Sequence, residues 1–199
     1  RNMIDSQLEF FGKSWKEKIS LFIPPTKALV VFHDSDKVHG DLKLDNLVFN
    51  SDMSALKLID FGFSVHIGTK IAGMTKEYVA PEIIEKITNI ALPSQDVWSW
   101  FITILLCFFP ILNRELLKLW PGHNTIYPYT PQGIETIEKV AAIYEKESGL
   151  PWVAMVKKWL VRDAEERPPM SELVSDLESL LNKASRLEKS KRKTILRIE

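Results

Sequence analysis

Residues 38–46 read VHGDLKLDN, and residues 58–63 read LIDFGF. Between their polar residues lie two short apolar runs, Leu47–Phe49 and Leu56–Ile59, which are separated by the polar sequence NSDMSA. Short apolar runs joined by Asn, Ser and Asp are typical of a β-hairpin. Because a hairpin brings its two outer ends together at one edge, we expect the polar residues of both stretches to meet there.

Four polar side chains would converge at that edge: Asp41, Lys43 and Asn46 from the first stretch, and Asp60 from the second. Mg²⁺ in proteins takes oxygen ligands, commonly one or two carboxylates together with phosphate oxygens. Phosphoryl transfer needs such a metal, a carboxylate that orients the attacking hydroxyl and accepts its proton, and a cation near the transferred group. The two carboxylates, the amide and the ammonium therefore suit a phosphoryl-transfer site.

The same residues belong to an ordered set of motifs. HGDLKLDN is followed by DFG, by MTKEYVAPEI with APE at Ala80–Glu82, by QDVWSW and by DAEERP. In this order and spacing, the set resembles the signature of the eukaryotic-type protein kinases. The resemblance covers about residues 26–181. Lys43, two residues after Asp41, resembles the serine/threonine type rather than the tyrosine type.

The resemblance implies roles for individual residues, with ATP and Mg²⁺ as cofactors. Asp41 would be the catalytic base, and Lys43 would steady the transferred phosphoryl group. Asn46 and Asp60 would hold the metal ions, and Thr75 would contact the catalytic loop and the substrate groove. The residues implied to bind the nucleotide are Lys43, Asn46, Val48 and Asp60.

Other residues would shape the site without touching the reacting atoms. By the same resemblance, Glu82 and Arg167 would form an ion pair that clamps the activation segment to the helical lobe. Asp96, at the head of a long apolar helix, would hold the backbone of the catalytic loop. The full set of residues with an expected structural role is His39, Phe61, Gly62, Glu82, Asp96 and Arg167.

The fold class implied by the resemblance is a protein-kinase-like α+β fold. This chain would form the mainly α-helical C-terminal lobe, with a small β-hairpin at the catalytic loop. An N-terminal lobe is not expected in this chain, because it contains no G-x-G-x-x-G sequence and only about 37 residues, with a helical pattern, precede the catalytic loop. That lobe would come from the same parent protein or from another chain, and the substrate would be a protein.

We interpret residues 1–182 as the kinase C-terminal lobe. Within this domain we expect the catalytic loop at residues 38–46, the activation segment at residues 60–82 and a buried central helix at residues 95–109. Residues 183–199 are basic and lose the apolar periodicity, so they are interpreted as a solvated helix end or tail.

Apolar residues at helical spacing predict most of the remaining elements. A first helix should be broken by Pro24 and Pro25, with a new short helix at Thr26–His33. The other predicted helices are Pro81–Lys86, Gln95–Phe109, Asn113–Trp120, Gly133–Glu147, Trp152–Arg162 and Met170–Ala184. The proline-rich stretch 120–133 is expected to be an irregular connection.

Composition argues against several other classes of protein. With 45% hydrophobic and 26% charged residues, the chain is typical of a globular protein. Lys plus Arg and Asp plus Glu number 26 each, so net charge does not favour a nucleic-acid partner. The apolar stretch Val97–Leu112 is too short to span a membrane and contains Pro110. The one cysteine, Cys107, permits no internal disulfide, and a cytoplasmic location is expected, with a secreted effector as the alternative.

Two other functions remain open at this stage. A pseudokinase lobe would act as a protein-interaction scaffold, and it would have no need of the four polar residues at the hairpin edge. A small-molecule kinase of the aminoglycoside or choline type shares the HGD sequence but lacks DFG followed by APE. One departure concerns regulation: Gly40 stands where most protein kinases carry an Arg that binds activation-segment phosphate. We therefore expect the geometry of this segment to be constitutive or regulated in another way, and not to be switched by phosphorylation.

Overall fold

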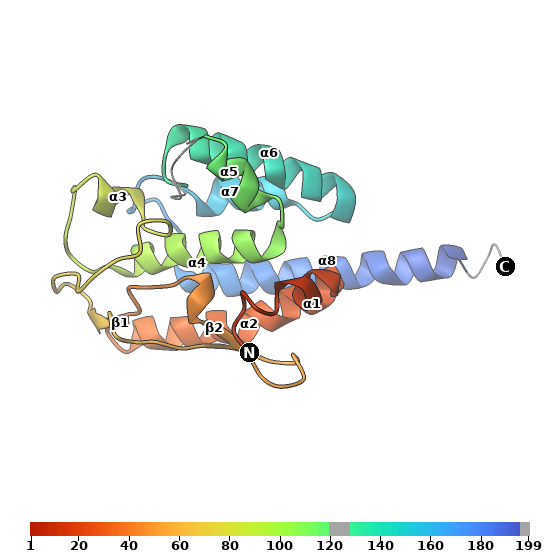
Figure 1. Ribbon diagram of the computed structural model, residues 1–199, viewed down its shortest axis with the longest axis horizontal. Coiled ribbons are helices and arrows are strands. Elements are labelled where there is room, and N and C mark those ends of the chain that lie inside the picture. The colour runs from red at the N-terminus through yellow and green to blue at the C-terminus, as the bar shows by residue number, and fades with distance from the viewer. Residues whose placement is uncertain (120–127, 196–199) are drawn as a thin grey trace.

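A buried helix, α4 (Pro93–Phe108), runs through the centre of the molecule. The computed structural model describes residues 1–119 and 128–195. In Figure 1, α2 (Trp15–Asp34) and α8 (Met170–Ile195) lie on one side of α4, and α5 (Leu112–Leu117), α6 (Pro131–Ser148) and α7 (Trp152–Trp159) lie on the other. Helix α4 is apolar on nearly all sides, as expected for a helix that is covered all round. The predicted central helix is present and begins two residues earlier than expected.

Shorter helices complete the lobe. Their bounds are α1 (Gln7–Gly12), α3 (Pro81–Ile84), α5 (Leu112–Leu117), α6 (Pro131–Ser148) and α7 (Trp152–Trp159). Their ends lie within about three residues of the predicted ones, except that α1 was not predicted as a separate helix. Helix α6 begins where the Thr130 hydroxyl accepts a hydrogen bond from Gly133 N, and it ends at Gly149, whose φ is 73°. Trp120 and most of the predicted connection 120–133 lie outside the described residues.

The predicted helix break at Pro24 and Pro25 is wrong, because α2 continues through both prolines to Asp34. Each proline removes one helical N–H donor and normally kinks or ends a helix. Here the following turn is fixed by Thr26, whose buried hydroxyl donates to the Phe22 carbonyl at 2.6 Å. The same hydroxyl accepts from the indole N–H of Trp100 in α4 at 2.8 Å. Tertiary contact with the core therefore keeps the chain helical where local propensity opposes it.

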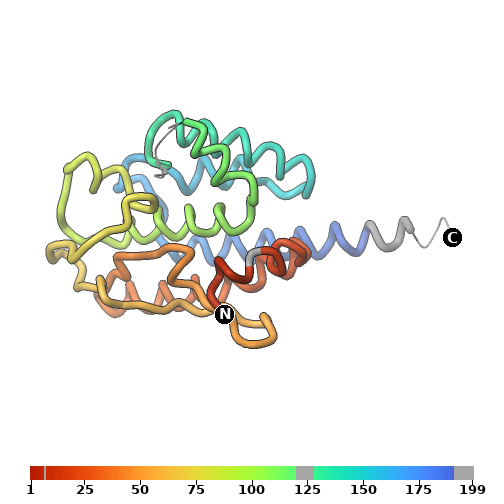
Figure 2. The backbone as a smooth tube through the Cα atoms, in the orientation of Figure 1, coloured from red at the N-terminus to blue at the C-terminus, as the bar shows by residue number. Residues whose placement is uncertain are grey.

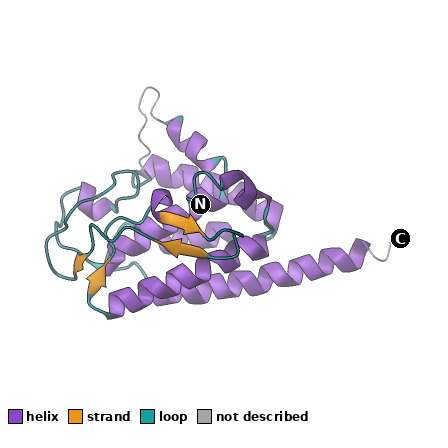
Figure 3. Cartoon of the chain, turned by 60° about the horizontal axis from the view of Figure 1, so that its bottom comes forward, coloured by secondary structure: helices purple, strands orange, loops and turns teal. Residues whose placement is uncertain are grey.

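The predicted hairpin is present. Strands β2 (Leu47–Phe49) and β3 (Leu56–Leu58) pair antiparallel, with Leu47 opposite Leu58, and Figure 3 shows them side by side against the helices. A second antiparallel pair, β1 (Lys37–Val38) with β4 (Val65–His66), was not predicted. It joins the start of the catalytic loop to the start of the activation segment.

Helix α8 extends beyond its predicted end at Ala184 and continues to Ile195. Its first half packs along α2 through a buried apolar stripe that consists of Leu173, Leu177, Leu180 and Ala184. The second half projects past the body of the molecule (Figure 1). Charged residues are good helix formers and need no burial there, so the end of the apolar pattern did not mark the end of the helix. The division of the chain near residue 182 stays a prediction.

Two expectations from the apolar sequence concern α4. Among the described residues, no helix is long and apolar enough to cross a membrane. Cys107 is fully buried in α4, and burial raises the pKa of its thiol well above the ordinary value. Because the thiolate is the reactive form, this cysteine has the inert character expected of a core residue.

Candidate active site

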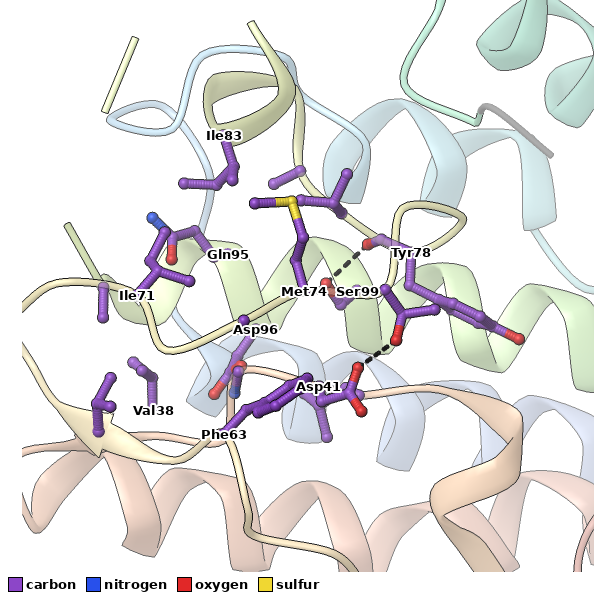
Figure 4. Close-up of a pocket in the computed structure, with 18 residues that line it drawn as sticks. Val38, Asp41, Phe63, Ile71, Met74, Tyr78, Ile83, Gln95, Asp96 and Ser99 are labelled. Carbon is purple, nitrogen blue, oxygen red and sulfur yellow. Dashed lines mark hydrogen bonds between the residues drawn. The ribbon is translucent and has the colours of Figure 1, made fainter. Parts of the chain in front are cut away.

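The Asp41 carboxylate forms the centre of a polar cluster built from two loops. Asp41 lies in the loop after β1, and its side chain is 5% exposed. The Thr75 hydroxyl donates to Asp41 Oδ1 at 2.5 Å, although the two residues are 34 positions apart. Figure 4 marks this hydrogen bond in the cavity that Asp41 lines. Lys43 Nζ lies 2.6 Å from Asp41 Oδ2 and 3.0 Å from Thr75 Oγ1, so one ammonium contacts both partners.

Asn46 closes the cluster from the other side. It ends a short 3₁₀ turn (Leu44–Asn46) that leads directly into β2. Its amide nitrogen donates to the Asp41 carbonyl at 2.8 Å and to Asp41 Oδ2 at 3.3 Å. With the nitrogen assigned to these two acceptors, the amide oxygen points to the other side and is the atom with which Asn46 could bind a cation.

Asp60 follows β3 and is exposed, with a left-handed backbone at φ 62°. Its Oδ1 accepts from Gly62 N at 3.1 Å, which closes the loop of the DFG sequence. The neighbouring Ile59 N donates to the Asn46 carbonyl at 3.0 Å, so the hairpin ties the two predicted metal-binding residues to one edge.

Val48, the other residue expected at the nucleotide, lies in the middle of β2. Its neighbours Leu47 and Phe49 face the core, and Val48 is half-buried on the opposite face. It pairs across the hairpin with Lys57, which is exposed. Alternation along the strand therefore places Val48 away from the core.

His39 is a fully buried imidazole that supports the loop from behind. Its ring packs against Phe61 at 4.9 Å between centroids, and Phe61 in turn packs against Phe32 at 5.6 Å. Burial lowers the pKa of His39 below its ordinary value of 6.5, although the carboxylates of Asp96, Asp41 and Asp60 and the Ile59 carbonyl oppose this shift. Asp41 N approaches His39 Nδ1 at 3.4 Å, as a neutral imidazole allows.

Asp96 fixes the backbone of the catalytic loop from the first turn of α4. Its carboxylate accepts from His39 N at 2.7 Å and from Gly40 N at 3.0 Å. His33 Nε2 lies 2.9 Å from the same carboxylate. Buried backbone N–H groups need such acceptors, because an unpaired one costs about 1–3 kcal/mol. The loop that carries Asp41 is thus anchored to the central helix.

Glu82 and Arg167, which lie 85 positions apart in the sequence, form a buried bidentate ion pair. Arg167 Nη1 lies 3.0 Å from Glu82 Oε1, and Nη2 lies 3.1 Å from Oε2. The guanidinium also donates to the carbonyls of Val161 and Ser94. A planar guanidinium that uses both nitrogens on one carboxylate fixes direction as well as distance. The pair joins α3, at the end of the activation segment, to the turn after α7.

The donor set fits a magnesium ion that also binds phosphates. Among the described residues there is no group of three or more His, Cys, Asp or Glu that could enclose a metal. Mg²⁺ does not require such a cage, because it is commonly held by one or two side-chain oxygens with phosphates and water completing its shell. The Asn46 amide oxygen and the Asp60 carboxylate supply oxygens of this kind.

Two residues of the site gave no signal in the sequence. His33 contacts Asp96 across 63 positions, a separation that no local spacing reveals. Phe63 contacts both site loops, and it looks like an ordinary apolar residue after DFG.

A protein-family model, described as protein kinase domain, matches residues 20–198. The chain belongs to the protein kinase family. An EPD1-interacting receptor-like cytoplasmic serine/threonine-protein kinase (5D) of Gossypium barbadense is 25% identical over 186 residues, which cover 84% of this chain and 39% of that protein. The probable serine/threonine-protein kinase PBL4 of Arabidopsis thaliana is 24% identical over 181 residues, covering 83% and 43%. The serine/threonine-protein kinase DCLK3 of Homo sapiens is 45% identical over 92 residues, covering 42% and 14%.

These matches confirm the resemblance to serine/threonine protein kinases. The chain spans about two-fifths of the length of the curated relatives that it matches along most of its own length.

Proposed function

We propose that this chain is the catalytic lobe of a serine/threonine protein kinase, which transfers the γ-phosphoryl group of ATP to a hydroxyl of a protein substrate. The observation that carries the proposal is the contact of Asp41 with Thr75 and Lys43, at 2.5 Å and 2.6 Å. In this proposal, the cluster contains the base, the cation and a residue of the activation segment. The family match and the names of the relatives support the same reaction.

In this proposal Asp41 orients the substrate hydroxyl and accepts its proton as the phosphoryl group is transferred. The Thr75 hydroxyl and the Asn46 amide hold the carboxylate in one orientation, so little reorganisation is needed when the proton moves. The Lys43 ammonium beside it stabilises the negative charge of the phosphoryl group during transfer.

Asn46 and Asp60 would hold magnesium on the other side of the cluster. Bound magnesium neutralises charge on the phosphates of the nucleotide. The Asn46 nitrogen remains with Asp41 while its oxygen faces the cation, so the same side chain would couple the base to the metal. Val48 would contact the nucleotide through its half-buried side chain.

A second lobe would complete the nucleotide site. Kinases of this family cover the phosphates with a Gly-rich loop and pair them with a strand lysine. The sequence contains no G-x-G-x-x-G, and the relatives are more than twice as long as the part that this chain spans. We propose that the N-terminal lobe comes from the same parent protein or from another chain.

The proposal is tested by phosphate transfer from labelled ATP to a generic protein substrate, with the full-length protein and its Asp41→Asn variant. Asparagine keeps the size of Asp41 and one accepting oxygen, but its amide nitrogen can accept neither the proton nor the contacts that Asn46 and Lys43 make with Oδ2. We expect transfer to fall by about 10²–10⁴-fold, the usual contribution of a general base. Label should appear on serine or threonine.

Equal label in wild type and variant would contradict the catalytic role of Asp41. If neither protein transfers phosphate while both bind a partner protein, the lobe is an interaction scaffold. Transfer to a small-molecule hydroxyl and to no protein would instead make it a small-molecule kinase. Both outcomes contradict the proposed function.

A further inference from the structure

Gly40, the residue before Asp41, is held against the backbone of the activation segment. Its φ is 80°, a conformation that side chains with a Cβ adopt at a cost. A Cβ at this position would lie 2.7 Å from the Phe63 carbonyl oxygen, closer than real contacts allow. Because the obstacle is backbone, it cannot be relieved by rotating a side chain. The position thus needs glycine for the chain to pass so close to Phe63.

Gly73, two residues before Thr75, is held against the other end of the same residue. A Cβ on Gly73 would lie 2.8 Å from Cε2 and Cζ of the Phe63 ring. The ring is the movable end of a side chain that is 39% exposed, so an added methyl group would displace it. The structure of this region therefore depends on a close fit between the Phe63 ring and a residue without a side chain.

Phe63 thus contacts both of the loops that build the catalytic cluster. Its carbonyl lies against Gly40, which precedes Asp41, and its ring lies against Gly73, close to Thr75. Phe63 and Asp41 line the same cavity in Figure 4. The 2.5 Å hydrogen bond between Thr75 and Asp41 requires that the two loops keep a fixed separation.

We infer that Phe63 is a positioning residue: it sets the separation of the Asp41 and Thr75 loops by packing without a gap against Gly40 and Gly73. The expected effect of Phe63 on catalysis rests on the proposed function. It gives the activation segment a steric support at the position where an arginine and a phosphate would otherwise supply a charged one.

Residues 68–71 of the activation segment are held by backbone hydrogen bonds to residues 89–91. Gly68 N donates to the Ala91 carbonyl at 2.9 Å, and Ala91 N donates to the Thr69 carbonyl at 2.8 Å. Ile71 N donates to the Asn89 carbonyl at 2.9 Å. In Figure 2 this segment, drawn in yellow, wraps around the end of the lobe where α4 begins. These bonds anchor residues 68–71, so the Phe63–Gly73 contact acts on a chain that is already fixed just upstream of it.

The first test is a double-mutant cycle on the full-length protein with Gly73→Ala and Phe63→Ala. Gly73→Ala should lower kcat about tenfold, which lies within the range of interaction energies measured for residues in direct contact. The KM for ATP should change less than about twofold. In the Phe63→Ala background, the same Gly73→Ala change should alter kcat less than about twofold, because the obstructing ring is gone. Equal effects of Gly73→Ala in both backgrounds would overturn the inference.

A matched pair of glycines separates the Phe63 contact from backbone strain. Gly40 and Gly68 have nearly the same φ, 80° and 81°, but a Cβ on Gly68 would meet nothing within 4 Å. Both alanine variants bear the strain of a left-handed residue, and only Gly40→Ala also collides with the backbone carbonyl of Phe63. We expect Gly40→Ala to lower kcat at least tenfold more than Gly68→Ala, a difference of about 1.4 kcal/mol or more. Equal losses would contradict the proposed role.

Amide hydrogen exchange provides a readout that does not depend on activity. In residues 71–79, exchange should be faster in Gly73→Ala than in wild type, and Gly73→Ala should add nothing to the exchange of Phe63→Ala. If wild type transfers no phosphate but exchange shows this coupling, the proposed function fails and the packing role of Phe63 stands. If transfer is normal and exchange of Gly73→Ala equals wild type, the inference fails and the function stands.

Discussion

The protonation of His39 is expected to affect the stability of the loop that carries Asp41. Its imidazole is buried and packs against Phe61, and its backbone N–H donates to Asp96. Burial lowers its pKa below 6.5, so the unfolded chain binds a proton at a higher pH than the folded one. The stability that neutral His39 contributes is therefore complete above pH 6.5, and it is lost as the pH falls from 6.5 towards the lowered pKa.

Urea unfolding at about pH 7.5 and about pH 5.5 measures this effect. We expect the free energy of unfolding to fall between the two values, by at most about 1.4 kcal/mol per pH unit for this one proton. In His39→Gln, which cannot titrate, the fall should be smaller, even if that variant is less stable at both values. An equal fall in both proteins would show that His39 does not account for the pH dependence.

At this scale the sequence predicted which polar residues meet and some of the residues that support them, such as Asp96, but not all of the supporting residues. Motif order alone assigned expected roles to Asp41, Lys43 and Thr75, which the structure places in one cluster. Motif order could not predict the contacts of His33 and Phe63, because these contacts depend on how distant segments of the chain pack. The glycine at position 40 was visible as a departure, but its physical reason needed the backbone angle and the position of Phe63.

At the scale of elements, α2 shows where pattern analysis fails. Two prolines predict a break, yet the buried Thr26 hydroxyl bonds both its own helix and Trp100 in α4. Thr26→Val keeps the shape of the side chain and removes both bonds. It leaves the fully buried Trp100 N–H without its partner, so we expect a loss of about 1–3 kcal/mol in the free energy of unfolding.

The measurement is urea unfolding of Thr26→Val, with Thr26→Ser as the matched control that keeps the hydroxyl. The serine variant should lose clearly less, because it keeps both hydrogen bonds and lacks only a methyl group. If both variants lose the same amount, the two hydrogen bonds do not stabilise α2, and the helix continues through the prolines for another reason.

Very short and very long elements were the least predictable. Strands β1 and β4 have two residues each, too few for an alternating pattern, and they form only because their backbones meet. Helix α8 had the opposite problem: its apolar stripe ends near Ala184, while its backbone stays helical to Ile195. Periodicity reports burial, so it located the packed part of α8 and not its full length.

For the whole molecule, the order of the motifs proved more informative than periodicity. It predicted the family, which the match over residues 20–198 confirms. It also predicted that Glu82 and Arg167 would pair, and the structure places them in contact across 85 positions. Neither periodicity nor composition could have predicted this ion pair. Periodicity compares residues that are close in the sequence, and composition contains no positions.

In the proposed function, two carboxylates of one site have different tasks: Asp41 would be the base and Asp60 a metal ligand. The most direct measurement is calorimetric binding of ATP with and without Mg²⁺ to the full-length wild type, Asp41→Asn and Asp60→Asn. We predict that Mg²⁺-dependent ATP binding is kept in Asp41→Asn and weakened at least about tenfold in Asp60→Asn, because of the two carboxylates only that of Asp60 would bind the metal. Unchanged Mg²⁺-dependent binding in Asp60→Asn would contradict this prediction.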